Sequence, residues 1–220
     1  MTADRLAAAT VNKIVTVNEA AVDSSAGRKL IVTALRLLAA GHPITVDELA
    51  ATAGVAAPDL AAAPVGGDIE YDDQGRIVGW GLTLKPTPHR FTVNGHQLYT
   101  YCAPDTLIFP VLIDEVADVE SEDPVTGTTV RLTVDPRQGV SGVEPAGAVV
   151  TFVDPERFDA TRVRATLCDP QRFFADAGAA RQWQARYPGM RIVPVPEGFS
   201  IAKDFAALLE TGATPVSGCC

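Results

Sequence analysis

The sequence predicts an α+β fold, with a helical N-terminal domain followed by a mixed α/β domain of short strands. Apolar residues recur at helical spacing near the N-terminus, whereas short alternating segments separated by turn signals follow Gly79. The chain has 220 residues, 47% of them hydrophobic and 20% charged, so it can bury a sizeable core. We therefore expect an N-terminal domain over residues 1–78, a second domain over residues 79–210 and a mobile tail over residues 211–220.

The N-terminal domain has the element order of a winged helix, which is three helices followed by a β-hairpin. The first helix is expected over residues 28–39, where apolar residues have helical spacing. A second helix should begin after Thr45, because Thr45 and Glu48 form the pattern of a capping box. A short third helix over residues 58–63 and a hairpin over residues 69–84 complete the predicted domain.

The charges of this domain oppose DNA binding, although a winged helix suggests it. Between Arg36 and Arg76 the sequence has no lysine or arginine and seven acidic residues. A recognition helix without basic side chains can neither neutralise phosphate groups nor hold a guanine base. The formal net charge of the chain, -9, also disfavours nucleic acid and anionic membrane surfaces as partners. We interpret residues 1–78 as a scaffold.

Nothing in the sequence indicates a membrane span or a signal peptide, so we expect a cytoplasmic protein. The apolar run at residues 106–113 is far too short to cross a bilayer, and the N-terminus has no apolar stretch before a cleavage site. In a reducing cytoplasm the four cysteines, Cys102, Cys168, Cys219 and Cys220, are expected to be thiols. No histidine lies at zinc-ligand spacing from any of them, which disfavours a structural zinc site.

The second domain is predicted to contain six strands and three helices. The strands are expected over residues 90–93, 96–101, 116–120, 128–134, 147–153 and 191–194, and the helices over residues 105–112, 177–187 and 201–209.

The segment around Cys102 carries the most chemical information. A strand delivers Cys102 to a turn, and Pro104 suits the first position of a helix. The helix N-terminus would favour a thiolate at Cys102, and Asp105 in the first turn could take up or deliver a proton. The same pattern also fits a small core cysteine followed by an aspartate that only stabilises the helix start.

Cys168 and the terminal pair are less distinctive. Val163, Ala165 and Leu167 alternate as in a strand, which would place Cys168 at a strand end. Alone, Cys168 reads as a buried thiol. Cys219 and Cys220 are adjacent, so they fit either an exposed dithiol or an incidental feature of the tail.

Taken together, these motifs resemble the organomercurial lyases (alkylmercury lyases) over most of the chain. The specific motifs are Leu98-Tyr-x-Tyr-Cys-Ala-x-Asp-Thr-Leu-Ile-Phe-Pro110, Val143-Glu-Pro-Ala-Gly147 and Cys168 followed by Phe173-Phe174. Residues 34–44, 79–84 and 197–199 extend the match. The resemblance implies a winged-helix-like domain not used for DNA, ahead of a lyase domain whose catalytic residues fall on Cys102, Asp105 and Cys168.

The resemblance further implies protonolysis of a carbon–mercury bond as part of mercury resistance. Cys102 and Cys168 would bind an organomercurial substrate, and Asp105 would deliver the proton and touch the Hg(II) product, with no organic cofactor or resident metal. Low-molecular-weight thiols and a mercuric reductase would accept Hg(II). Cys219 and Cys220 are similar to the C-terminal cysteine pair of mercuric reductases, so we expect them to take part in product transfer.

Two departures and two alternatives accompany this interpretation. Relatives often carry Trp where this chain has Tyr101, and some carry a further cysteine within residues 119–129, which this chain lacks. A cysteine-based metal- or redox-responsive regulator is one alternative, but it predicts a basic recognition helix. A non-enzymatic mercury carrier is the other, and it would need the cysteines but not Asp105.

Overall fold

The computed structural model describes residues 3–16, 24–56, 60 and 68–211 of the chain. Two antiparallel sheets and six α-helices make up this part, in agreement with the predicted α+β class. The helices are α1 (Ala3–Thr16), α2 (Ser24–Leu38), α3 (Val46–Ala53), α4 (Ala103–Ile113), α5 (Ala177–Arg186) and α6 (Val195–Thr211).

The larger sheet has eight strands in the order β1-β2-β3-β5-β4-β6-β7-β8, and the smaller has three in the order β10-β9-β11. The strands of the larger sheet are β1 (Glu70–Tyr71), β2 (Ile77–Trp80), β3 (Leu82–Thr83), β4 (His89–Val93), β5 (His96–Thr100), β6 (Ala117–Glu122), β7 (Thr129–Asp135) and β8 (Gly139–Glu144). Those of the smaller sheet are β9 (Val149–Val153), β10 (Phe173–Phe174) and β11 (Met190–Pro194).

The helical N-terminal region follows local sequence signals closely. Thr45 caps α3 through its side chain, which accepts from the Glu48 N–H, and Glu48 completes the predicted capping box. Gly54 ends α3 in the left-handed conformation, as glycine does readily. The structure adds α1, which was not predicted, and most of the third helix predicted over residues 58–63 lies outside the described residues.

The predicted hairpin forms, but its second arm is broken. β1 pairs with β2, and the chain then turns at Gly81 into the separate strand β3. Gly81 has a φ of +80°, and an added Cβ would lie 2.8 Å from the Phe109 ring. Glycine is therefore needed there both for the turn and for close packing against α4.

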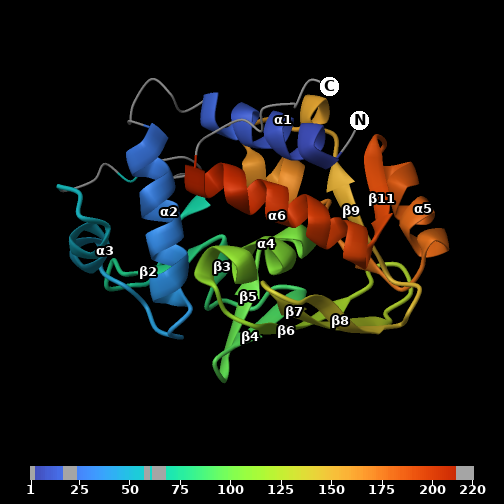
Figure 1. The fold of residues 1–220 in the computed structure, drawn as a ribbon, viewed down its shortest axis with the longest axis horizontal. Coiled ribbons are helices and arrows are strands. Elements are labelled where there is room, and N and C mark those ends of the chain that lie inside the picture. The colour runs from blue at the N-terminus through green and yellow to red at the C-terminus, as the bar shows by residue number, and fades with distance from the viewer. Residues whose placement is uncertain (1–2, 17–23, 57–59, 61–67, 212–220) are drawn as a thin grey trace.

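Helix α4 lies at the centre of the molecule, between α6 and the larger sheet (Figure 1). Nine of its eleven residues are buried, so it is apolar on every face, as expected of a helix enclosed by protein. One row of aligned side chains crosses the larger sheet and belongs to the same buried hydrophobic cluster as the side chains of α4. The row consists of Leu98 in β5, Phe91 in β4, Val119 in β6 and Leu132 in β7. The core is continuous from Leu6 in α1 to Leu208 in α6.

Helix α6 crosses the face of the molecule and packs against both α1 and α4 (Figure 1). It starts six residues earlier than predicted, because Pro196 fits the first turn of a helix and Gly198 does not end it. Strands β8 and β10 were also missed. β8 contains Gly139 and Gly142, both with positive φ, and it is held in the sheet by pairing with β7.

Candidate active site

Cys102 lies at the junction of β5 and α4, as the sequence predicts. It is the N-cap of α4, with extended backbone, and Pro104 follows in the first helical turn. The Asp105 carboxylate accepts from the Cys102 backbone N–H at 3.2 Å, which closes a capping box in which a cysteine replaces the usual serine or threonine. This local motif fixes the two side chains on one side of the helix start.

Cys168 is not at the end of a strand, and that prediction was wrong. Residues Arg164–Cys168 form a single π-helical turn, closed by a bond from the Asp169 N–H to the Arg164 carbonyl. The Thr166 hydroxyl stabilises the turn by donating to the Arg162 carbonyl at 2.8 Å. Isolated π turns occur frequently at functional sites.

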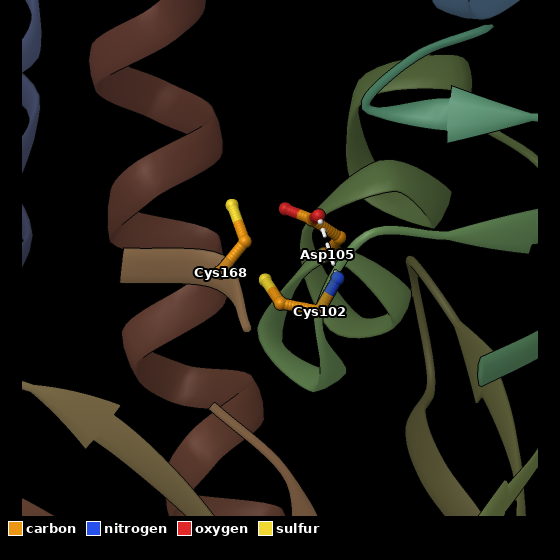
Figure 2. Close-up of side chains that lie close together, drawn as sticks. All are labelled: Cys102, Asp105 and Cys168. Atoms are coloured by element: carbon orange, nitrogen blue, oxygen red, sulfur yellow. Dashed lines mark hydrogen bonds between the residues drawn. The ribbon is translucent and has the colours of Figure 1, made fainter. Parts of the chain in front are cut away.

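The three predicted residues come together although Cys168 is distant in sequence from the other two. The Sγ atoms of Cys102 and Cys168 and a carboxylate oxygen of Asp105 all lie within 4.8 Å of one another. Figure 2 shows both thiols and the carboxylate directed into the same small space, with Cys168 on a separate segment facing the start of α4. No other group of three potential metal ligands of this kind occurs within the described residues.

Burial decides the protonation of Asp105. Loss of solvent raises the pKa of the Asp105 carboxyl to about 7, and this effect outweighs the hydrogen bonds from Cys102, which lower the pKa. The sequence left this balance open, because a helix N-terminus favours the carboxylate. A carboxyl with a pKa near neutrality can both accept and deliver a proton at physiological pH.

Burial also raises the pKa values of both cysteines. The Cys102 side chain is only 2% exposed, and its pKa lies well above the ordinary value because burial, the neighbouring Cys168 and the Asp105 charge all disfavour a thiolate. A hydrogen bond from Cys102 lowers the pKa of Cys168, but burial and the charges of Asp105, Asp68 and Asp169 outweigh it. The expected thiolate at Cys102 is thus not favoured by these surroundings.

The cluster opens into an apolar cavity with a volume of about 150 Å³. Aromatic and aliphatic side chains form most of its wall, from Trp80, Tyr101, Ile108, Phe109, Phe152, Val163, Leu167, Phe205 and Leu209. Residues of α1 and α2, including Val11 and Ile31, line the same cavity. A pocket that is mainly apolar with a few convergent polar groups is typical of a small-molecule site.

Arg164 connects the π turn that carries Cys168 to Tyr101, the residue before Cys102. The Arg164 guanidinium lies 4.2 Å from the centre of the Tyr101 ring and donates to the Glu70 carboxylate at 2.8 Å. The Tyr101 hydroxyl donates to the Asp68 carbonyl at 3.1 Å. Tyr101 thus supports the cavity wall, where relatives were expected to carry a tryptophan.

The structure brings together the three side chains that the sequence predicts as catalytic, and sequence reasoning missed some of their neighbours. Gln171 is buried, lines the cavity and donates to Cys102 Sγ, yet a single glutamine after a Pro gives no recognisable signal in one sequence. Asp68 also lines the cavity, and burial raises its pKa. Cys219 and Cys220, predicted to act in product transfer, lie outside the described residues.

The donor set suits a soft metal better than a hard one. Two sulfur atoms and one carboxylate oxygen within 4.8 Å can hold a large thiophilic ion, and the apolar wall can take an organic group attached to it. The Asp105 carboxyl, with a pKa of about 7, lies next to both sulfurs and can accept or deliver a proton near neutral pH. The arrangement is therefore suited to metal capture together with acid–base chemistry.

Comparisons with known proteins agree with this chemistry. Residues 82–207 match the alkylmercury lyase family, and residues 18–81 match the helix-turn-helix domain of alkylmercury lyase. The alkylmercury lyase of Streptomyces lividans is 46% identical over 191 residues, which cover 84% of this chain and 85% of the relative. That of Staphylococcus epidermidis is 40% identical over 190 residues, covering 84% and 85%.

The fold has a counterpart among solved structures. A crystal structure described as the mercury-bound form of MerB2 superposes with a TM-score of 0.71 at 20% sequence identity, covering 91% of this chain and 98% of that chain. At that identity the likeness supports the fold alone. With the family matches spanning residues 18–81 and 82–207, and curated relatives of 40% identity or more, the chain belongs to the alkylmercury lyase family.

Proposed function

We propose that Cys102, Cys168 and Asp105 carry out the lyase reaction, in which an organomercurial is split into a hydrocarbon and Hg(II). The observation that supports these roles is the meeting of two sulfurs and one carboxylate oxygen within 4.8 Å at the wall of an apolar cavity. Mercury prefers sulfur ligands, and the apolar wall suits the organic group.

The reaction balances with these three side chains alone. Cys102 Sγ bonds to the mercury of R–Hg–X, X⁻ leaves and the thiol proton is released. Cys168 Sγ then forms a second sulfur–mercury bond while Asp105 accepts its proton. The second sulfur ligand increases the electron density on the carbon, and Asp105 returns the proton to that carbon as the carbon–mercury bond breaks. The products are R–H, H⁺, X⁻ and Hg(II) held by both cysteines.

The raised thiol pKa values are compatible with this sequence of steps. A metal ion that binds sulfur lowers the pKa of the thiol, so each thiol loses its proton as its bond to mercury forms. The carboxyl of Asp105, with a pKa of about 7, is available as a carboxylate for the uptake and as an acid for the delivery.

The remaining roles follow the charge and composition of the chain. Residues 1–78 act as a scaffold without nucleic acid, because α3 carries Asp47 and Glu48 in its first turn and no basic residue in its last. Low-molecular-weight thiols and a mercuric reductase remove Hg(II), with Cys219 and Cys220 as intermediaries.

The free thiols of Cys102 and Cys168 fit a reducing cytoplasm. Among the described residues, no helix is both long and apolar enough to span a bilayer.

The test is release of hydrocarbon from ethylmercury by the purified protein with excess thiol, measured by gas chromatography of the headspace. The unaltered protein should release ethane, and Cys102→Ser and Cys168→Ser should each lose turnover while circular dichroism shows an intact fold. An active Cys168→Ser enzyme would refute the two-sulfur mechanism.

Asp105→Asn separates a lyase from a mercury carrier. The variant keeps both sulfurs, so it should still bind ethylmercury but release ethane at least about 100-fold more slowly, because general acid catalysis contributes at least that much. Binding is followed by displacement of a coloured thiol-reactive mercurial. Near-normal ethane release by Asp105→Asn would show that another group supplies the proton.

A further inference from the structure

A second hollow, to which the reaction above gives no part, lies between α2, α3 and the C-terminal end of α6 and has a volume of about 690 Å³. The end of α6 packs against α2 there (Figure 1). We call this hollow the α2 groove. Three basic side chains, Arg28, Lys29 and Arg36, line it together with one acidic side chain, Glu210. In a chain with a formal net charge of -9, such a local excess of positive charge favours an anionic ligand.

The α2 groove follows one face of α2, whose lining residues are Lys29, Val32, Thr33 and Arg36. Residues three, four and seven positions apart share a face of an α-helix, so the two basic residues at its ends point to the same side. The Arg36 guanidinium is fixed by two bonds to the Leu112 carbonyl, from Nε at 3.2 Å and from Nη2 at 3.0 Å. Its ion pair with Glu210 joins two half-exposed side chains at 3.9 Å and is therefore weak.

The α2 groove adjoins the cavity that contains the two cysteines. Arg28 and Leu209 line both spaces, and Ile31, one helical turn after Arg28, lines the cavity. Among the described residues of the cavity wall, Arg28 is the only one with a positive charge. A molecule that reaches the sulfurs with an anionic arm can therefore place that arm beside Arg28 and extend it into the groove.

The chemistry of mercury identifies a ligand with such an arm. Mercury prefers thiolates, so with excess thiol an organomercurial is carried as the adduct R–Hg–SR′. We propose that the α2 groove binds the carboxylates of the thiol in this adduct, so that the preferred substrates are adducts of carboxylate-bearing thiols. As Cys102 Sγ bonds to mercury, the Hg–SR′ bond breaks and the thiolate leaves with the Cys102 proton as R′SH. Selection between adducts rests on the proposed function, whereas carboxylate binding in the groove does not.

The kinetic test compares two ethylmercury adducts, that of mercaptosuccinate, which has two carboxylates, and that of 2-mercaptoethanol, which has none. The ratio of kcat/KM for ethane release from the two adducts is measured at low ionic strength, with the matching thiol in excess. A ratio cancels any effect of a substitution that is common to both adducts. Arg28→Gln should reduce the preference for the mercaptosuccinate adduct about tenfold, the effect of losing one hydrogen bond to a charged group.

Further variants separate charge from structure. Lys29→Gln should reduce the preference by a smaller factor, and Arg28→Lys, which keeps the charge, should retain most of it. Arg181→Gln is the matched control, because it removes an exposed positive charge from α5 at the opposite end of the molecule (Figure 1) and should leave the ratio unchanged. If Arg28→Gln does not fold, Lys29→Gln decides, since the Lys29 side chain is exposed. Ratios within about twofold of the unaltered protein in the folded variants refute the proposal.

A second measurement needs no mercury. (Methylthio)succinate is a thioether with the same two carboxylates, and 2-(methylthio)ethanol is its neutral counterpart. In amide NMR spectra the dicarboxylate should shift signals of residues 28–36, less so in Arg28→Gln, and the neutral thioether should not. These shifts without ethane release by the unaltered protein would uphold the groove and refute the proposed function. Ethane release without the shifts, and with unchanged ratios in the variants, would refute the groove and leave the proposed function standing.

Discussion

Asp105 shows how one residue can serve two purposes in the same place. As the third residue of α4 it accepts from the Cys102 N–H, which is an ordinary stabilising role at a helix start. The surrounding apolar side chains bury it and raise the pKa of its carboxyl to about 7. A carboxyl that keeps its proton near neutrality lowers stability at higher pH, because the unfolded chain releases that proton far more readily.

Because the pKa of Asp105 is higher in the folded chain than in the unfolded chain, we predict a pH-dependent stability difference between the protein and Asp105→Asn. Below pH 4 the carboxyl is protonated in both the folded and the unfolded chain, so it contributes nothing. Between pH 4 and 7 only the folded chain holds the proton, and its stability falls as pH rises. Asn cannot ionise and is still able to accept from Cys102. The variant should therefore gain about 4 kcal/mol relative to the unaltered protein between pH 4 and 8.

Urea unfolding at several pH values measures this difference. Asp73→Asn, at an exposed turn position away from the cavity, shows the general effect of removing one negative charge from an acidic chain. A difference between Asp105→Asn and the unaltered protein that stays constant from pH 4 to 8 would mean that the folded state does not perturb Asp105.

At the scale of elements, the sequence predicted best what is decided locally. Both capping boxes, Thr45 with Glu48 and Cys102 with Asp105, involve residues three apart and could be read directly. The turn between the predicted strands at residues 90–93 and 96–101 is a similar case, since its residues Asn94 and Gly95 both have positive φ in the hairpin of β4 and β5. These motifs were sufficient to place the first cysteine and the acid correctly.

The same approach gave the wrong structure for the Cys168 segment, because contacts with residues distant in sequence determine its conformation. A short alternating apolar run fits a strand or a helical turn equally well. Here Arg164 stacks on Tyr101 and donates to Glu70, both of which are distant in sequence. The contacts of Gln171 with Val153 and Ala103 are likewise formed between segments distant in sequence. Such partners become visible only in the folded chain.

The packing of α6 on α4 leads to a prediction at this scale. Gly198 lies where α6 meets the core, and an added Cβ would be 2.5 Å from Val150 Cγ1 and 3.3 Å from Leu107 Cδ1. Overpacking of this kind costs about 1–3 kcal/mol, whereas replacing a helical glycine by alanine gains about 1 kcal/mol. Gly198→Ala should therefore lower the free energy of unfolding by about 1 kcal/mol, measured in urea.

Gly147→Ala is the matched control for that substitution. Its added Cβ would meet only the Ala175 carbonyl oxygen, at an ordinary contact distance of 3.8 Å. The control should therefore leave the stability nearly unchanged. Equal stabilities of Gly198→Ala and the unaltered protein would show that α6 can move away from β9 and α4 without cost.

Across the whole molecule, the N-terminal helices and the second domain share one core and one cavity. Val11 of α1 and Ile31 of α2 line the cavity that contains Cys102, and Phe205 of α6 completes the wall. The two parts of the sequence on either side of the boundary predicted near residue 78 therefore pack into one hydrophobic core. This shared packing supports the proposal that the N-terminal helices act as a scaffold that closes the cavity.

The enclosed site also raises the question of how Hg(II) leaves it. In the proposed reaction two sulfurs hold the Hg(II) product, and external thiols compete with them in a cavity of about 150 Å³. The segment Thr211-Gly-Ala-Thr-Pro-Val-Ser-Gly-Cys-Cys220 can span roughly 30 Å if extended. A dithiol tethered to the same chain competes at an effective concentration that free thiols do not easily reach. We therefore expect Cys219 and Cys220 to speed product release.

Deleting residues 218–220 tests this expectation. The truncated protein should cleave ethylmercury at the unaltered rate in a single turnover, because Cys102, Cys168 and Asp105 remain. At low external thiol its release of Hg(II), followed with a chromogenic chelator, should be slower than that of the full chain, and the gap should close as thiol is added. A Cys219→Ser/Cys220→Ser variant keeps the length of the tail and should behave like the deletion. Equal release rates at low thiol for all three proteins would exclude transfer through the terminal pair.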